Sequence, residues 1–528
     1  MASFALPQTS TSFVFPVDAP GASPSQGIVG PAPFDAPASA GDLLRPGGPQ
    51  GDPRCGPRPL LEVMQPPANR LIDLLRKHYP AYEQTTPLPD HVRHAMQMVQ
   101  LCHTAALGGH VETCPDGHIT RIFSNSCGHR FCPRCAGRQR RAWLLARRAK
   151  HLPVRHYHVI FTLPHAFNDL WRLNVRLMGD LLFHSATGAL RALLADPTRL
   201  GAEPGMTVTL ETWDDRLCLH PHLHCLVTGG GLSPEGEWVD VPTPRCLVGV
   251  KPLMWEFRKR FCRALQEVLE QEKHEQEKHE DATPATPETL TLPKDTIPRQ
   301  WLNRLNKVNR QKWDVFIAKP PEDGGPTTAV IEAYLADDIA GGPLAAIRLE
   351  AAPPAPLPDQ DLRDAQLLYL KSAPMSDRRL EDPQHQDGHG QVTFRWGAYN
   401  PDTGIRERDQ TETLPVDEFL RRFLQHVPPS GYQTVRHYGL YASGHATTPA
   451  YDRCCALLSD RESAAPPPSP DDAPDTDAWR QQHTCPVCGQ PLIVSGYVPS
   501  SLTGHVIPRV PLGHVFAPSA SPGGGHDP

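Results

Sequence analysis

The sequence predicts an α+β protein in which a mainly antiparallel sheet is flanked by helices, with a zinc-binding module before it and a small cysteine-bearing tail after it. Some segments alternate apolar and polar residues, as strands do, and others repeat apolar residues at helical spacing. Cysteines also gather at metal-ligand spacings within a polar stretch, which predicts the module.

Proline and glycine, 60 and 40 residues in all, are concentrated in blocks between the regions with regular patterns. Such blocks bury too little apolar surface to offset the loss of chain entropy, so we expect them to be disordered. No stretch approaches the ~20 consecutive apolar residues of a membrane helix, and the N-terminus lacks a basic region leading into an apolar one. The 14 cysteines are clustered, unlike the framework of a small secreted domain. We therefore expect a cytoplasmic protein.

Regular elements are expected along most of the remaining chain. Residues 69–79 and 91–101 have helical periodicity, the second with Asp90 as its N-cap. An antiparallel hairpin of 206–213 and 216–227 is expected around a turn at Asp214-Asp215. The other expected elements are strands at 156–163, 312–320 and 433–442, helices at 167–195, 253–271, 327–339 and 415–426, and a hairpin of 391–399 with 405–414.

Two histidines on one expected strand form the first candidate metal site. Side chains alternate faces along a strand, so His222 and His224 share one face while Leu223, Cys225 and Val227 take the other. Two imidazoles can bind a divalent metal but do not complete its coordination sphere, so a third ligand must come from elsewhere. On its own a His-x-His pair is more often an ordinary polar strand face. The glycines 229–231 that follow leave room for a bulky ligand and favour a site.

The first cysteine cluster predicts a structural zinc site. Cys132 and Cys135 supply two thiolates from one turn, and Cys127 lies five residues before them. Cys114 or His118, upstream, can complete a tetrahedron of soft ligands. Free buried cysteines are the alternative, but the stretch is too polar for that explanation.

Near the C-terminus, Cys485 and Cys488 form half of a candidate second zinc site. The sequence does not identify their partners, although Cys454, Cys455 and His483 are available.

A basic segment follows the first cluster and points to nucleic acid. The chain has a net charge of −6, but residues 130–155 contain nine Lys and Arg and no Asp or Glu. A helix carrying these cations can contact phosphates; the alternative is a solvated helix face. The candidate DNA-binding residues are Arg138, Arg140, Arg141, Arg147, Arg148 and Lys150.

Several motifs occur here in one order: GGHVETCPDGH with NSCGHRFCPRC, then YHVIFTLPH, HPHLHCLVTGGG, KWDVFIAKPP and AVIEAYLADDIAGGPL. In this combination the chain resembles the HUH-type rolling-circle transposases of the insertion sequence ninety-one family, including their common-region relatives. The resemblance covers most of residues 85–490. It implies an HUH nuclease-type sheet and an N-terminal transposase zinc-binding domain.

The resemblance also implies an activity. Members of the family nick and join single-stranded DNA at element ends, using Mg²⁺ or Mn²⁺ on the paired histidines and a tyrosine that forms a 5′-phosphotyrosine. The first tyrosine of the family's Tyr-Leu-x-x-Tyr motif matches Tyr334, but the second position is Asp338. Residues i and i+4 share a helix face, so we hypothesise that Asp338 is the third metal ligand. Tyr438 and Tyr441 remain fallback nucleophiles.

Together these features predict a domain order and leave two functions open. The expected order is disordered 1–65, a zinc-binding DNA-recognition domain at 66–150, a catalytic domain at 151–445 with a charged linker at 270–298, a disordered linker at 446–482, a zinc-ribbon-like tail at 483–515 and disordered 516–528. The expected function is a nucleoid-associated transposase. The alternative is a catalytically inactive, zinc-dependent DNA-binding remnant of a mobile element, which the Asp at position 338 keeps open. A small-molecule metallohydrolase is disfavoured because no further His or Asp follows His224 closely.

Overall fold

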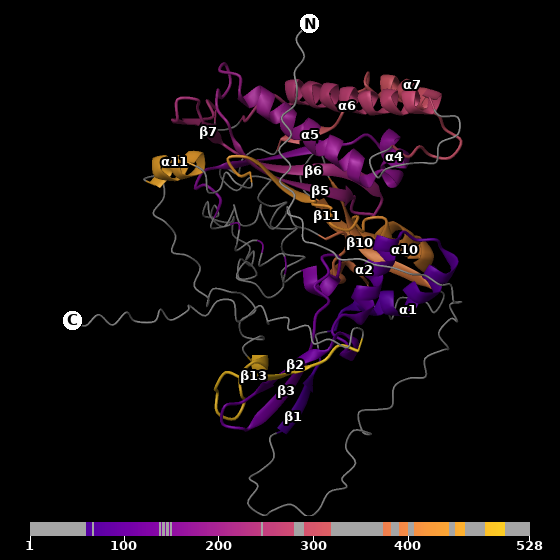
Figure 1. The fold of residues 1–528 in the computed structure, drawn as a ribbon, viewed down its shortest axis with the longest axis vertical. Coiled ribbons are helices and arrows are strands. Elements are labelled where there is room, and N and C mark those ends of the chain that lie inside the picture. Colours follow the sequence, from indigo (N-terminus) through magenta and orange to yellow (C-terminus); the bar gives the residue numbers. More distant parts are fainter. Residues whose placement is uncertain are drawn as a thin grey trace, which may run out of the picture. The chain divides into compact units, whose positions relative to one another are not determined.

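The structure is a computed structural model that describes most of the chain between residues 60 and 501 (Figure 1). In full, it describes residues 60–65, 68–136, 139, 143, 147, 150–243, 246–278, 290–317, 373–381, 390–399, 406–442, 449–459 and 481–501. These residues mix helices and sheets, which confirms the expected α+β class. Among them, no helix is both long and apolar enough to span a bilayer.

Strands between His156 and Gly439 form a five-stranded antiparallel sheet. Its strand order is β12-β5-β6-β4-β9, so the strand that carries the two histidines is central. The five strands are β4 (His156–Thr162), β5 (Gly205–Trp213), β6 (Leu219–Thr228), β9 (Val315–Ile317) and β12 (Val435–Gly439).

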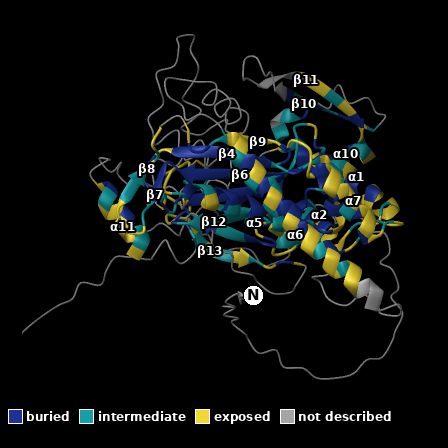
Figure 2. Ribbon diagram, turned by 90° about the horizontal axis from the view of Figure 1, so that it is seen from above, coloured by how far each residue is buried: buried dark blue, intermediate teal, exposed yellow. Residues whose placement is uncertain are grey.

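Helices cover one face of this sheet, and the core lies between them. The inward side chains of β6 are Leu223, Cys225 and Val227, and none of them is exposed. Figure 2 shows β4 and β6 as buried, while α6 turns one exposed face outward. The helices are α4 (Asn168–Leu173), α5 (Val175–Leu194), α6 (Val250–Lys278) and α7 (Pro298–Val308), preceded by a short 3₁₀ turn, η3 (His165–Phe167).

The spacing of apolar residues in α6 explains why this helix forms and how it packs. Its buried side chains recur every four residues, which keeps them on one face. The five residues of this stripe are fully buried: Leu253, Phe257, Phe261, Leu265 and Leu269. The helix continues to Lys278, past the expected end at residue 271, because the charged repeat suits a solvated helix.

The expected helix at 167–195 is interrupted at Asn174. The Asn174 side chain donates to the carbonyl oxygens of Leu170 (2.8 Å) and Thr291 (2.7 Å) and accepts from the Thr291 N–H (2.7 Å). A side chain that holds a neighbouring segment in this way competes with the helical backbone bonds, which explains the break. Its amide also fixes the segment at Thr291 against the helices.

The N-terminal region has its own sheet and a helical core. The sheet order is β1-β3-β2-β13, from β1 (Leu60–Met64), β2 (Gly109–Thr113), β3 (Ile119–Ser124) and β13 (Ile493–Val498). In Figure 1 the yellow β13 runs beside β2, although almost 400 residues separate them. Residues 483–498, expected to form a tail of their own, therefore pair with the zinc-binding region.

The helices of this region pack against a hairpin from the second half of the chain. α1 (Arg70–Thr85) and α2 (Asp90–Leu101) share a core with β10 (Gln391–Tyr399), β11 (Arg406–Pro415) and α10 (Val416–Leu424). α1 extends past the expected end at residue 79 because Tyr79 and Tyr82 continue its buried face. α2 includes Asp90, and Pro89 rather than Asp90 is its N-cap.

Smaller elements complete the described chain. β7 (Gly230–Leu232) pairs with β8 (Trp238–Asp240) just after β6. α11 (Pro449–Leu458) packs with Leu152 and Tyr441. Besides η3, the described residues form two further 3₁₀ turns, η2 (Ala105–Leu107) and η5 (Asp377–Arg379). The expected helix at 327–339 and the acidic segment at 279–289 lie outside the described residues.

The stripe on α6 makes a testable contribution to stability. Replacing the fully buried Phe257 with Ala is expected to lower the free energy of unfolding by about 3–5 kcal/mol, because it leaves a cavity in the core. The control is Trp255→Ala on the same helix, whose side chain is 57% exposed. That variant should stay within about 0.5 kcal/mol of the wild type. Urea unfolding followed by circular dichroism measures both, and equal losses would contradict the described packing.

Candidate metal centres and nucleic-acid interface

The two histidines of β6 meet a carboxylate from the neighbouring strand. β5 and β6 pair so that Glu211 lies opposite His222 and Thr209 opposite His224. The Nε2 atoms of His222 and His224 lie 3.8 and 3.5 Å from Glu211 Oε2. Glu211, His222 and His224 are 5%, 9% and 2% exposed, so three ligand-type side chains converge in a buried place on the polar face of the sheet.

Hydrogen bonds set the orientation of both imidazoles. His222 Nδ1 donates to the carbonyl oxygen of His220 (2.7 Å), which leaves the Nε2 lone pair directed at the cluster. His224 Nδ1 lies 2.9 Å from His158 Nε2, a partner from β4 on the other side of β6. Burial, followed by the neighbouring His224, lowers the pKa of His222 to about 3, so this ring is neutral at physiological pH. Neutral imidazole is the form that binds metals.

The turn between β5 and β6 is held from outside the hairpin. Leu217 has a positive φ of 61°, and Asp214 caps the turn by accepting from the Cys218 N–H at 2.7 Å. Buried His426 bonds to Thr212 Oγ1 at 3.0 Å and donates to the Leu217 carbonyl at 3.1 Å. The segment after α10 therefore fixes the strand end next to Glu211.

The donor set suits a divalent cation. With metal–ligand bonds of about 2.0–2.2 Å, neighbouring ligand atoms lie roughly 3.0–3.6 Å apart, close to the separations of Glu211 from the two rings. A carboxylate buried beside two imidazole rings also gains from a nearby positive charge. Three protein ligands leave further coordination positions open for substrate oxygens or water. Glu211 was not identified as a candidate ligand from the sequence. The pattern that could have indicated it is the polar face of the expected strand, on which Glu211 follows Thr207 and Thr209.

The structure does not place the two remaining residues of the expected catalytic group. Tyr334 and Asp338 lie outside the described residues. Of the fallback nucleophiles, Tyr441 is 5% exposed, and its hydroxyl accepts from the Leu152 N–H (3.0 Å) and lies 2.8 Å from His156 Nε2. Tyr438 lies on β12, opposite Met206. Tyr441 therefore has a structural position that does not favour nucleophilic attack.

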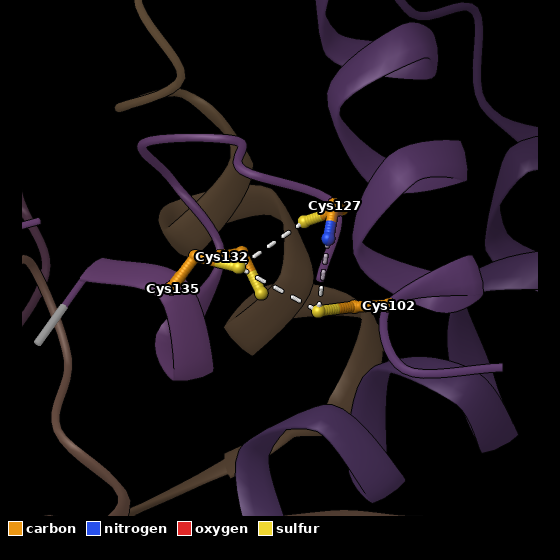
Figure 3. Close-up of side chains that lie close together, drawn as sticks. All are labelled: Cys102, Cys127, Cys132 and Cys135. Atoms are coloured by element: carbon orange, nitrogen blue, oxygen red, sulfur yellow. Dashed lines mark hydrogen bonds between the residues drawn. The ribbon is translucent and has the colours of Figure 1, made fainter. Parts of the chain in front are cut away.

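Four cysteines converge in the N-terminal helical core. Figure 3 shows their sulfur atoms turned toward one another, with Cys102 from the end of α2 and Cys132 and Cys135 from one turn. Cys135 Sγ lies 3.6 Å from the sulfur atoms of Cys102 and Cys127. All four are buried, and their ligand atoms lie within 4.8 Å of one another. The fourth member is thus Cys102, not Cys114 or His118 as the spacing suggested.

Cys114 and His118 lie in a different group, together with Cys485 and Cys488. The spacing argument placed them with Cys127 because they are near it in sequence, but β2 and β3 form a hairpin whose turn carries Cys114 and His118 toward β13. Neither Cys454 nor Cys455 belongs to this group. They lie on α11, where Cys454 is buried in a separate apolar cluster.

Only part of the expected DNA-binding surface is described. Arg147 is half-buried and Lys150 exposed, whereas Arg138, Arg140, Arg141 and Arg148 lie outside the described residues. Arg130, from the same basic segment, donates to the Tyr432 carbonyl oxygen at 2.7 Å. A cavity of about 110 Å³ lies beside Arg130. It is lined by residues of the basic segment, including Arg130 and Gln139, and by residues later in the chain, including Glu211 and Tyr432.

Comparisons with known proteins bear on this arrangement. A model described as "Transposase zinc-binding domain" matches residues 74–163, and one described as "Putative transposase" matches residues 205–354 and 366–448. A putative transposase, y4qJ, from Sinorhizobium fredii is 33% identical over 443 residues, which cover 82% of this chain and 96% of the relative. The chain belongs to the IS91 family of transposases.

A second relative agrees with this assignment. The transposase of insertion sequence element IS801 from Pseudomonas savastanoi pv. phaseolicola is 24% identical over 344 residues, covering 65% of this chain and 68% of the relative. No solved structure matches the chain. The family resemblance drawn from the motifs is confirmed, and this IS91-family transposase is an enzyme that acts on DNA. Its zinc-binding domain and cysteine clusters indicate structural zinc.

The role of Cys102 as a zinc ligand in the helical cysteine group, which consists of Cys102, Cys127, Cys132 and Cys135, can be tested directly. Cys102→Ser is expected to lower the zinc content by about one ion per chain and to lower the melting temperature, because a structural zinc site contributes folding energy. Inductively coupled plasma mass spectrometry and a thermal melt measure the two effects. Cys246→Ser, at an exposed cysteine outside both groups, is the control and should change neither. Unchanged zinc in Cys102→Ser would reject Cys102 as a ligand.

The contact between His158 and His224 predicts an effect on metal affinity. His158→Ala should weaken Mn²⁺ binding about 10- to 100-fold, the usual effect of losing a group that orients a metal-binding imidazole. Isothermal titration calorimetry measures this affinity. His184→Ala, an exposed histidine on α5, is the matched control and should bind Mn²⁺ as the wild type does. Equal affinities in both variants would show that His158 does not orient His224.

Proposed function

We propose that this transposase nicks and joins single-stranded DNA at element ends, with a divalent cation, Mg²⁺ or Mn²⁺, held by Glu211, His222 and His224. The observation that supports this is the convergence of the three side chains on adjacent strands in a buried, polar part of the sheet. The five-stranded antiparallel sheet with helices on one face suits the HUH nuclease type, and its central strand carries the histidines.

The residues of the cluster have separate roles in this proposal. When bound, the cation would neutralise charge on the scissile phosphate and orient it for in-line attack. Glu211 contributes the negative charge that favours a cation, while the two imidazole ligands are oriented by the His220 carbonyl and by His158. The three side chains that would hold the cation lie on the polar face of the sheet, because the inward face of β6 is filled by Leu223, Cys225 and Val227.

We propose Tyr334 as the nucleophile. Its phenol oxygen loses its proton and forms a bond to phosphorus, the bond from phosphorus to the 3′ oxygen breaks, and the leaving oxygen takes up a proton to become a 3′ hydroxyl, so no net proton is gained or lost. The 5′-phosphotyrosine conserves the phosphodiester energy, so a later attack by a 3′ hydroxyl rejoins the strand without ATP. A single tyrosine fits the sequence, which has Asp338 rather than a second tyrosine four residues after Tyr334. Asp338 remains a candidate for a further ligand.

The basic segment and the cavity give the DNA a proposed path. Arg147 and Lys150 belong to the run of cations that follows the cysteine group, together with Arg138, Arg140, Arg141 and Arg148. Cations in this run would bind phosphates and release counterions. The cavity beside Arg130 is also lined by Glu211, one of the three residues of the metal cluster. We propose that the strand enters there, and that the protein works on the DNA of the nucleoid.

The covalent step provides the main test of this function. The wild type, incubated with Mn²⁺ and labelled single-stranded oligonucleotides from the element ends, should form a protein–DNA adduct that survives denaturing electrophoresis. Tyr334→Phe should abolish the adduct but keep DNA affinity within about twofold, because it removes only one hydroxyl. An adduct that persists would reject Tyr334. Tight binding without any wild-type adduct would favour the alternative, an inactive DNA-binding remnant, which the altered motif at Asp338 suggests.

The role of Glu211 makes a second prediction. Glu211→Gln should slow nicking by about 100-fold or more at fixed Mn²⁺, because the amide keeps the shape but loses the charge that holds the cation. Nicking rates at several Mn²⁺ concentrations measure this effect, and excess metal should restore part of the rate. Glu267→Gln on α6, an exposed carboxylate, is the control. An unchanged metal dependence in Glu211→Gln would remove Glu211 from the site.

A further inference from the structure

We propose that Cys114, His118, Cys485 and Cys488 form a second zinc site, which fastens the C-terminal segment to the N-terminal sheet. Cys485 and Cys488 lie beyond residue 163, where the match to the transposase zinc-binding domain ends, so that domain alone cannot supply all four ligands. The inference is independent of the nicking reaction proposed above.

The ligand atoms are already gathered at distances suited to one zinc ion. Cys114 Sγ lies 3.5 Å from Cys488 Sγ and 3.5 Å from His118 Nδ1, and Cys485 Sγ lies 3.9 Å from the same nitrogen. With Zn–S bonds of about 2.3 Å and Zn–N bonds of about 2.0 Å, a tetrahedral shell places its ligand atoms roughly 3.5–3.8 Å apart. Three thiolates and one imidazole are an ordinary ligand set for structural zinc.

The two halves of the site have similar backbone turns. Each begins with Cys-Pro and turns through a glycine of positive φ, Gly117 (73°) and Gly489 (71°). In one turn the Gly117 N–H donates to the Cys114 carbonyl at 2.9 Å, and in the other the Gly489 N–H donates to the Cys485 carbonyl at 2.9 Å. Each tight turn presents two ligands on one side, and the two turns face each other as the two halves of a zinc ribbon do.

Contacts besides the metal ligands align the two halves. Arg121 on β3 is 7% exposed, and its Nη1 donates to the carbonyl oxygens of Gln481 (3.0 Å), Gln482 and Thr484 (3.1 Å). Three carbonyls just before Cys485 are thus bound by one guanidinium. Its Nε donates to Glu62 on β1 at 2.8 Å, so Arg121 ties three segments together.

A second set of contacts involves residues of β2 and β3. His483 Nδ1 lies 2.7 Å from Glu112 Oε2, and the His483 ring stacks on Phe123 at 4.5 Å. Beyond the ligands, β13 pairs with β2 from Ile493 opposite Thr113 to Val498 opposite Gly109. The C-terminal segment therefore docks in one register, which holds Cys485 and Cys488 against Cys114 and His118.

The measured zinc content distinguishes a second zinc site from four neighbouring side chains that bind no metal. The purified full-length wild type should hold about two zinc ions per chain after dialysis, and the double variant Cys485→Ser with Cys488→Ser about one. The double variant Cys246→Ser with Cys455→Ser, at two exposed cysteines outside the groups, should keep about two. A wild type with one zinc, or a ligand variant that keeps two, would overturn the proposal. So would a disulfide between Cys114 and Cys488 found by mass spectrometry in its place.

A conservative variant guards against a ligand variant that fails to fold. His118→Cys should keep both metal ions and, after replacement of zinc by Co²⁺, should strengthen the thiolate-to-cobalt charge-transfer band, because it adds one thiolate to the second site. An unchanged band with full metal content would show that His118 is not a ligand.

Hydrogen exchange tests the fastening itself. Chelation should speed amide exchange in β13 by at least about 10-fold in the wild type, since ligand binding stabilises only the closed arrangement. In the Cys485→Ser, Cys488→Ser variant, exchange in β13 should already be fast and insensitive to the chelator. Exchange in β13 that ignores chelation in the wild type would overturn the role of the metal as a fastener.

Discussion

The register between β5 and β6 is the constraint on which the site depends. A shift of one residue would turn every side chain of β6 to the other face, placing Leu223, Cys225 and Val227 where the histidines are and the histidines in the core. The core prevents this shift, because all three apolar residues are fully buried beneath α5 and α6. The same pairing puts Glu211 opposite His222. Packing on one face of the sheet thereby sets the positions of Glu211, His222 and His224 on the other.

The N-terminal helical region and later parts of the chain share one hydrophobic core. The four cysteines of the helical group share a core with Phe394, Phe419 and Phe423 from the second half, and Phe131 packs on Phe423 with ring centroids 4.8 Å apart. Arg130, between Cys127 and Cys132 in sequence, binds backbone carbonyls near Tyr432. A structural zinc at this group would therefore stabilise more than the local turn. It would also hold the α1 and α2 helices against the β10–β11 hairpin.

Local patterns in the sequence predicted most of the elements but not their long-range partners. The β5–β6 hairpin and the shared face of His222 and His224 follow from alternation and a turn signal within a few residues. Glu211 could not be chosen from the sequence, because its role depends on the register and on a bulge between Glu211 and Trp213. The predicted cysteine grouping was wrong for a similar reason. Nearness in sequence favoured Cys114 as the fourth member of the first group. In the structure the β2–β3 turn places Cys114 beside Cys488, and Cys102 is the fourth member instead. Asn174 shows the same limit, since its helix break depends on Thr291.

The pairing of β13 with β2 has a consequence for biosynthesis. Ribosomes release Gly109–Thr113 long before Ile493–Val498, so the edge of β2 waits through the synthesis of almost 400 further residues before its neighbour arrives. A polypeptide cut short by premature termination would expose that edge, and its Cys114 and His118 would lack the two cysteines, Cys485 and Cys488, that lie beside them in the full chain. An unpaired strand edge favours aggregation, so chains that lack β13 would be more prone to aggregate than chains that complete the four-stranded sheet.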